Sequence, residues 1–263
     1  MERKQHGFTL IELAVVLVII GLIVGSVLAI QSIVRVSQLH KMLEEYNANV
    51  EALKEFQDKF LALPGDMKGI AGYTPEDMWG QDASCPNTPS TTVAHIATCN
   101  GDGLGTIGNS DASGSTEWFR AWQQLSDAGF IPGSFTGTPG SGGGQEARPG
   151  QNVPASAVSG AGWTLYYYSQ IADGPNLWGD QYGHIMVLGE FTPGGITMSP
   201  ALTAVEALSI DQKIDDGNPG LGIVRAFRNT GCTTDTGSQA SQVYNTNGGS
   251  TVPACSLIFL TRF

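Results

Sequence analysis

The sequence predicts an α+β protein in which one long N-terminal helix packs on an antiparallel β-sheet head. Three observations predict this fold class. Residues 13–34 carry no charged side chain and are predominantly apolar. An apolar stripe then continues at helical spacing as far as Phe60. Several short strand-like runs follow in a glycine-rich remainder. One helix followed by strands favours a helix packed against an antiparallel sheet.

The charge-free run from Leu13 to Val34 is long enough to cross a membrane. Its 22 residues span roughly 33 Å as a helix, at ~1.5 Å per residue. Arg3 and Lys4 precede the run, so the positive-inside bias places the N-terminus in the cytoplasm and the rest of the chain outside. Glu12 stands directly before the run, and a carboxylate in hydrocarbon needs a partner. Glu12 is therefore a candidate functional residue.

A short basic leader precedes the segment Gly7-Phe8-Thr9-Leu10-Ile11-Glu12. This segment resembles the prepilin leader of type IV pilins and type II secretion pseudopilins. The resemblance implies that a membrane prepilin peptidase cleaves after Gly7 and that Phe8 is N-methylated. It also implies that Glu12 pairs with the Phe8 amine of a neighbouring subunit, which would offset the cost of burying either charge alone. The alternative is a plain single-span anchor with an incidental acid near its end.

The expected organisation has four parts. Residues 1–7 are the leader, 8–34 the transmembrane and assembly half of the long helix, 35–63 its amphipathic half, and 64–263 a loop-rich globular head. The amphipathic half carries an apolar stripe of Leu39, Leu43, Tyr46, Val50, Leu53 and Phe60. Its charged face carries Glu44, Glu45, Glu51, Glu55 and Lys59. Gly21 and Gly25 fit either close helix contact or simple tolerance of glycine in a membrane span.

Two helices and four strands are expected in the head. One helix covers residues 117–128 and is stopped by Gly129. The other runs from Ser199-Pro200 to about Asp215, with Thr203 and Glu206 in capping-box spacing. The strand-like runs are 163–168, 184–191, 221–227 and 256–261. Residues 131–154 are rich in Gly, Pro and Ser and are expected to form an exposed loop.

The head is strongly acidic. From Met42 onward there are 22 acids and 9 Lys plus Arg, a net charge of −13 with His neutral. This charge disfavours nucleic acid as a partner, and the candidates for a local basic patch are Arg225, Arg228 and Arg262. No nucleotide site is expected either, because the glycine-rich segment 101–105 has no lysine and follows no convincing strand.

The four cysteines lie in the exported part of the chain. Two local pairs, Cys85–Cys99 and Cys232–Cys255, are the most economical of the three possible connectivities, and an oxidising compartment would favour both. Pilins resemble the chain here too, since many close a C-terminal loop with a disulfide where Cys232 and Cys255 lie. A zinc site is disfavoured, because the sequence has no C-x-x-C.

Calcium is the one cofactor that the sequence suggests. Asn100 and Asp102 offer hard oxygen ligands, as does the cluster of Asp211, Asp215 and Asp216. Asp215 and Asp216 are the predicted ligands. Neither segment matches an EF-hand, however, and an Asp-Gly turn forms without a metal.

No catalytic residue is predicted, and the chain is not expected to be an enzyme. His95 and His184 are the histidines beyond the long helix, in regions without G-x-S-x-G or H-E-x-x-H, and His184 is interpreted as structural. Trp178, Tyr182 and the run Tyr166-Tyr167-Tyr168 could form a carbohydrate or aromatic recognition surface. Core packing with one exposed ring is the simpler interpretation, because Tyr166 and Tyr168 share one strand face.

The resemblance implies a structural subunit, a major or minor pilin, of a type IV pilus-like filament. The precursor would be a single-pass inner-membrane protein with a periplasmic head. Its expected partners are the membrane, prepilin peptidase and the other pilin subunits. Two alternatives stay open: a pseudopilin of a type II secretion machine, and a minor pilin displayed as an adhesin or DNA-uptake subunit.

Overall fold

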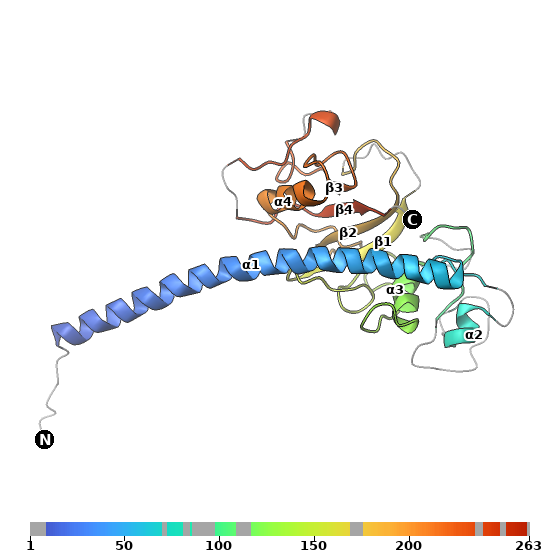
Figure 1. Ribbon diagram of the computed structural model, residues 1–263, viewed down its shortest axis with the longest axis horizontal. Helices are drawn as coiled ribbons and strands as arrows, with labels where there is room; N and C mark the ends of the chain where they lie inside the picture. The colour runs from blue at the N-terminus through green and yellow to red at the C-terminus, as the bar shows by residue number, and fades with distance from the viewer. Residues whose placement is uncertain are drawn as a thin grey trace, which may run out of the picture.

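A single long helix dominates the computed structural model, which describes residues 9–69, 73–80, 85, 98–108, 117–168, 176–234, 239–247 and 251–261. This helix, α1 (Leu10–Phe60), has 51 residues, or about 77 Å at 1.5 Å per residue. Figure 1 shows its C-terminal half against the head and its N-terminal half projecting away as an uncovered rod. The helix ends at Phe60, as predicted, and Leu61 caps it in a left-handed conformation with φ of 53°.

The head is built on a four-stranded antiparallel sheet. Its strands are β1 (Ala161–Tyr168), β2 (Gly183–Glu190), β3 (Val224–Ala226) and β4 (Leu257–Leu260), in the spatial order β1-β2-β4-β3. The predicted α+β class and the four strands are therefore confirmed. β3 is shorter than the predicted run 221–227, and the Ile223 N–H directly before it donates to the Asp215 carboxylate.

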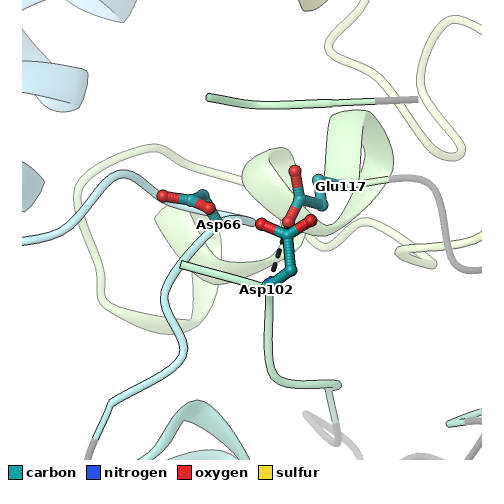
Figure 2. A group of neighbouring side chains, drawn as sticks. All are labelled: Asp66, Asp102 and Glu117. Carbon is teal, nitrogen blue, oxygen red and sulfur yellow. Dashed lines mark hydrogen bonds between the residues drawn. The ribbon is translucent and has the colours of Figure 1, made fainter. Parts of the chain in front are cut away.

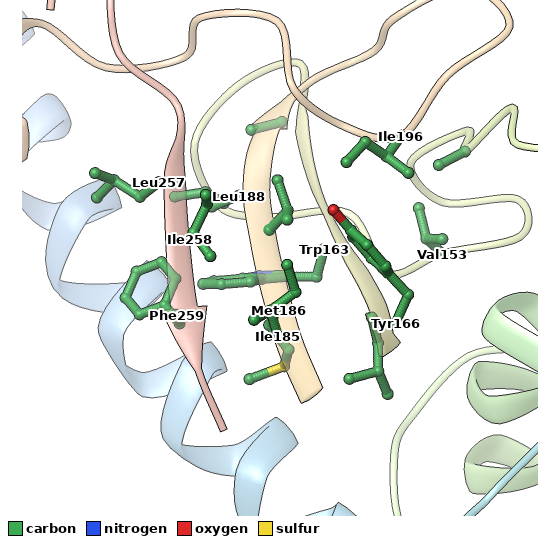
Figure 3. Packing of buried hydrophobic residues seen from close by; sticks show 14 of the residues in the cluster. Val153, Trp163, Tyr166, Ile185, Met186, Leu188, Ile196, Leu257, Ile258 and Phe259 are labelled. Carbon is green, nitrogen blue, oxygen red and sulfur yellow. The ribbon is translucent and has the colours of Figure 1, made fainter. Parts of the chain in front are cut away.

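The C-terminal half of α1 lies over one face of this sheet. The Tyr46 ring lies 6.3 Å from the Trp163 ring of β1 and 4.7 Å from the Phe259 ring of β4, between centroids. Side chains alternate along a strand, so Trp163 and Leu165 face α1, whereas Tyr166 and Tyr168 face the other way. Figure 3 shows Trp163, Met186 and Phe259 in the apolar cluster of this sheet.

The buried face of α1 differs from the predicted stripe. Its most buried positions are Met42, Asn49, Ala52, Leu53 and Phe56, so the stripe of 39, 43, 46, 50, 53 and 60 is rotated by about one residue. The prediction that Glu45 belongs to the charged, solvent-facing side is wrong. Its carboxylate accepts hydrogen bonds from Ser156 Oγ, from the Ala157 N–H and from Trp163 Nε1 at 2.8–3.3 Å.

The described part of the head also contains three helices, α2 (Pro75–Trp79), α3 (Glu117–Asp127) and α4 (Ala204–Ile214), and a short 3₁₀ turn at Gln239–Ser241. The predicted helix at 117–128 is confirmed as α3, and α2 was not predicted. Pro64-Gly65 packs closely on α3: Gly65 has φ of +82°, and a Cβ there would lie 2.4 Å from the Glu117 carbonyl oxygen. Glycine is therefore required at this position for steric and conformational reasons.

Helix α4 begins later than predicted. Thr203 caps it and forms the predicted capping box with Glu206. The residues before Thr203 do not extend the helix, because their backbone pairs elsewhere. Ser199 bridges to Glu190, and Leu202 bridges to Cys255.

The segment 131–154 is not the exposed loop that its composition predicted. Ile131, Phe135, Ala147 and Val153 are buried in the core, although the central glycines 142–144 are exposed. Polar side chains replace regular backbone pairing here. The Asn152 amide, for example, donates to the carbonyls of Thr138 and Glu146 at 3.0 and 2.9 Å. Irregular backbone can therefore be buried, because its polar groups are satisfied.

Asp127, the last residue of α3, is expected to make the head less stable as the pH rises. One carboxylate oxygen is buried without a hydrogen-bond partner in the described part of the chain, and burial raises the pKa of Asp127 to about 7, against a smaller opposing effect of Arg120. The folded state therefore binds this proton more tightly than the unfolded state. The free energy of unfolding therefore decreases as the pH rises from about 4, the pKa of this group in the unfolded state, to about 7, its pKa in the folded state.

We expect Asp127→Asn to stabilise the protein by about 1 kcal/mol above pH 8 and to have little effect near pH 4. Thermal unfolding of the full chain in detergent at both pH values measures the difference. Glu55→Gln, which changes an exposed acid on α1, is the control. Equal effects of Asp127→Asn at the two pH values would contradict the prediction.

Candidate functional site

The N-terminal half of α1 is an apolar surface that the rest of the chain leaves uncovered. Between Leu10 and Val36, sixteen of the large apolar side chains that the structure describes are each at least half exposed. They are Leu10, Ile11, Leu13, Val15, Val16, Leu17, Val18, Ile19, Ile20, Leu22, Ile23, Val24, Ile30, Ile33, Val34 and Val36. By length and composition α1 could cross a membrane. We call this uncovered half of α1, residues 10–34, the stem.

Glu12 sits in the first turn of the stem and makes a capping box with Thr9. Its Oε2 accepts hydrogen bonds from the Thr9 N–H and the Thr9 hydroxyl, both at 2.8 Å. The Glu12 N–H in turn donates to the Thr9 hydroxyl at 3.3 Å. No described residue donates to Oε1. Gly7 and Phe8, the predicted processing and assembly residues, lie outside the described residues.

The surface of the stem is open at Gly21 and Gly25. A Cβ atom added at Gly21 or at Gly25 would meet nothing within 4 Å. The two glycines therefore lie at an open surface of the helix, which is compatible with either interpretation of their spacing.

An ion pair marks the place where α1 first meets the head. Arg35 Nε donates to one Glu206 oxygen at 2.6 Å and its Nη2 to the other at 2.9 Å. The same Nη2 donates to the Ala201 carbonyl at 2.9 Å. Burial would raise the pKa of Glu206, but hydrogen bonds from Arg35 and Thr203 outweigh it and the pKa is lowered. This pair, which fixes α4 to the helix, was not foreseen, although Arg35 is the first charge after the apolar run.

Both local cysteine pairs are joined in the structure. Cys85 is bonded to Cys99, with their Cα atoms 5.5 Å apart, and Cys232 to Cys255, with theirs 4.9 Å apart. The second disulfide lies beside α4, because the Cys255 carbonyl accepts the N–H groups of Ala201 and Leu202.

The predicted candidates for a basic patch do not form one among the described residues. Arg225 is 5% exposed and pairs with Asp180 at 2.8 Å. The Arg228 guanidinium lies over the Trp178 ring, 5.0 Å from its centroid, and Arg262 is outside the described residues. Because Arg225 is buried, the two described arginines do not form an exposed cluster to which nucleic acid could bind.

Three acids from separate segments converge beside α3. Figure 2 shows Asp66, Asp102 and Glu117 facing one another, with carboxylate oxygens within 4.8 Å. Glu117 accepts the N–H groups of Asp102 and Gly108 at 3.2 and 2.6 Å, and Asp66 accepts those of Leu104 and Gly105. Burial raises the pKa of Glu117 to about 8 and that of Asp66 to about 6. Because their hydrogen bonds to the backbone of residues 102–108 explain the arrangement, we interpret this group as structural.

Asp66 and Glu117 were missed because they are distant in sequence from Asp102. A weak signal for them exists: Asp66 directly follows Pro64-Gly65 and Glu117 begins a helix, both positions where a carboxylate often accepts backbone N–H groups. Asn100, predicted beside Asp102, instead exchanges hydrogen bonds with Glu76 of α2.

The second acidic group contains the predicted calcium ligands. Oxygens of Asp211, Asp215 and Asp216 lie within 4.8 Å of one another. Asp211 is buried and accepts hydrogen bonds from the Tyr244 hydroxyl at 2.8 Å and the Gly217 N–H at 3.1 Å. Asp215 accepts two N–H groups of the residues that lead into β3, and Asp216 is exposed. Calcium binding at Asp215 and Asp216 stays a prediction.

His184 lies in the core of the head. It is 8% exposed, and its Nε2 accepts the Ile107 N–H at 3.1 Å. Burial lowers the pKa of His184 to about 4, so the ring is neutral at pH 7 and serves as a hydrogen-bond acceptor. His95 lies outside the described residues.

The N-terminal segment also matches a known family model. Residues 3–28 match the prokaryotic N-terminal methylation motif, which is the prepilin-cleavage signal of type IV pilins and pseudopilins. The match includes Gly7, Phe8 and Glu12. No curated protein and no solved structure matches the chain. The motif supports a type IV pilin-like or pseudopilin subunit, a structural rather than a catalytic class of protein.

The Arg35–Glu206 pair is expected to stabilise the attachment of the head to α1. Glu206→Gln keeps an acceptor for the capping box but removes the charge, so we expect a loss of about 1 kcal/mol. A double-mutant cycle that combines Arg35→Ala with Glu206→Gln, measured by thermal unfolding in detergent, gives the coupling free energy between the two side chains. Thr203→Ala, which removes the cap hydroxyl and keeps the pair, is the control. A coupling of zero would contradict the prediction.

If calcium binds at Asp215 and Asp216, it should stabilise the folded protein. Added calcium is expected to raise the Tm of the full chain and EDTA to reverse the change, because a ligand that binds the folded state stabilises it. Asp216→Asn should reduce the response, and Glu55→Gln should not. An unchanged Tm on chelation would rule the prediction out.

Proposed function

We propose that the chain is a structural subunit, a major or minor pilin, of a type IV pilus-like filament. In this proposal prepilin peptidase removes residues 1–7 and the stem then leaves the membrane to join a bundle of other pilin stems. One observation carries the proposal: the stem is an uncovered apolar rod, and the methylation motif lies at its start.

The energetics of the stem support assembly with other helices. Each large apolar side chain held in water costs about 1.5–3 kcal/mol relative to burial, and sixteen described side chains of this kind between Leu10 and Val36 are at least half exposed in the isolated chain. The membrane removes that cost in the precursor. A filament must remove it by packing stems against one another, and open positions at Gly21 and Gly25 permit close approach.

Glu12 would set the axial position of one subunit against the next. Its Oε2 is engaged with Thr9, whereas Oε1 has no donor in the described part of the chain. An oxygen of this kind can accept an N–H of the Phe8 ammonium of a neighbouring subunit. Such a pair in an apolar bundle stabilises one register, because every displaced register leaves a charge buried without a partner.

The proposed location is the inner membrane, with a single span and a periplasmic head, and afterwards the filament. Arg3 and Lys4 before the span support this orientation. The two disulfides fit an oxidising compartment. We propose no catalytic activity, since assembly requires burial and pairing and no bond-making step at the head.

A type II secretion pseudopilin is the second candidate, because it shares the same motif. Two disulfides and a large head favour the pilus. Immunogold labelling distinguishes the two candidates, since a pilus subunit appears on surface fibres and a pseudopilin stays periplasmic.

Substitutions at Glu12 test whether its charge or its capping role matters. We expect Glu12→Ala and Glu12→Gln to be inserted and processed normally but to reach sheared filaments at least ~10-fold less than the wild type, since one unpaired buried charge costs more than 1.4 kcal/mol. Immunoblots of sheared filaments measure incorporation, and mass spectrometry of the N-terminus measures processing.

The control is Thr9→Ala, which removes the capping hydroxyl and keeps the Glu12 charge. It should be incorporated at close to the wild-type level. Wild-type incorporation of Glu12→Gln would mean that the carboxylate only caps the helix. Residues 1–7 still attached to the native protein would refute processing.

A further inference from the structure

We draw no further inference here: the strongest candidate, the mainly apolar groove of about 410 Å³ that Lys41, Glu45 and Asn49 of α1 line together with residues 130–135 of the head, carries none, because nothing in the structure shows what covers it.

Discussion

Fifteen large apolar side chains that the structure describes on the stem are at least half exposed, and they leave water only when lipid or other helices surround them. The head does not provide this cover, because it meets α1 from Arg35 onward and packs on the side chains of α1 from Leu39 to Phe60. The chain is thus divided along one continuous helix, with an internal core at one end and an external, unsatisfied apolar surface at the other. Membrane insertion and polymerisation are two solutions to the same solvation problem.

Charged residues of α1 with specific partners lie at the two ends of the stem and in the half that packs on the head. Glu12 stands at the start of the stem and Arg35 at its end, and no charged residue lies between them. Thr9 satisfies part of the Glu12 carboxylate, while Glu206 and Ala201 receive the Arg35 guanidinium. Farther along, Glu45 is turned into the head by Trp163 and the backbone of Ala157. Each charge is therefore held by a specific partner at a boundary between environments.

The elements with a strong local pattern could be predicted from the sequence, and those fixed by distant contacts could not. The long helix, α3, the capping box at Thr203 and the four strands follow from periodicity and capping chemistry. The helix face was misjudged by one residue, because Glu45 finds buried donors that periodicity ignores. The buried segment 131–154 was taken for an exposed loop, because Asn152 and Glu146 supply bonds that composition does not reveal. Of the candidate sites, the N-terminal motif could be predicted from the sequence. The cluster of Asp66, Asp102 and Glu117 could not, because folding brings its residues together from separate segments.

The junction between stem and head also has a mechanical aspect. Arg35 binds the Ala201 carbonyl and the first turn of α4. The adjacent Leu202 exchanges backbone hydrogen bonds with Cys255, which is covalently tied to Cys232 and leads directly into β4. β4 lies between β2 and β3 in the sheet. A tensile load along α1 thus reaches an inner strand and a covalent crosslink within a few residues, which opposes peeling of the globular part from the rod under traction.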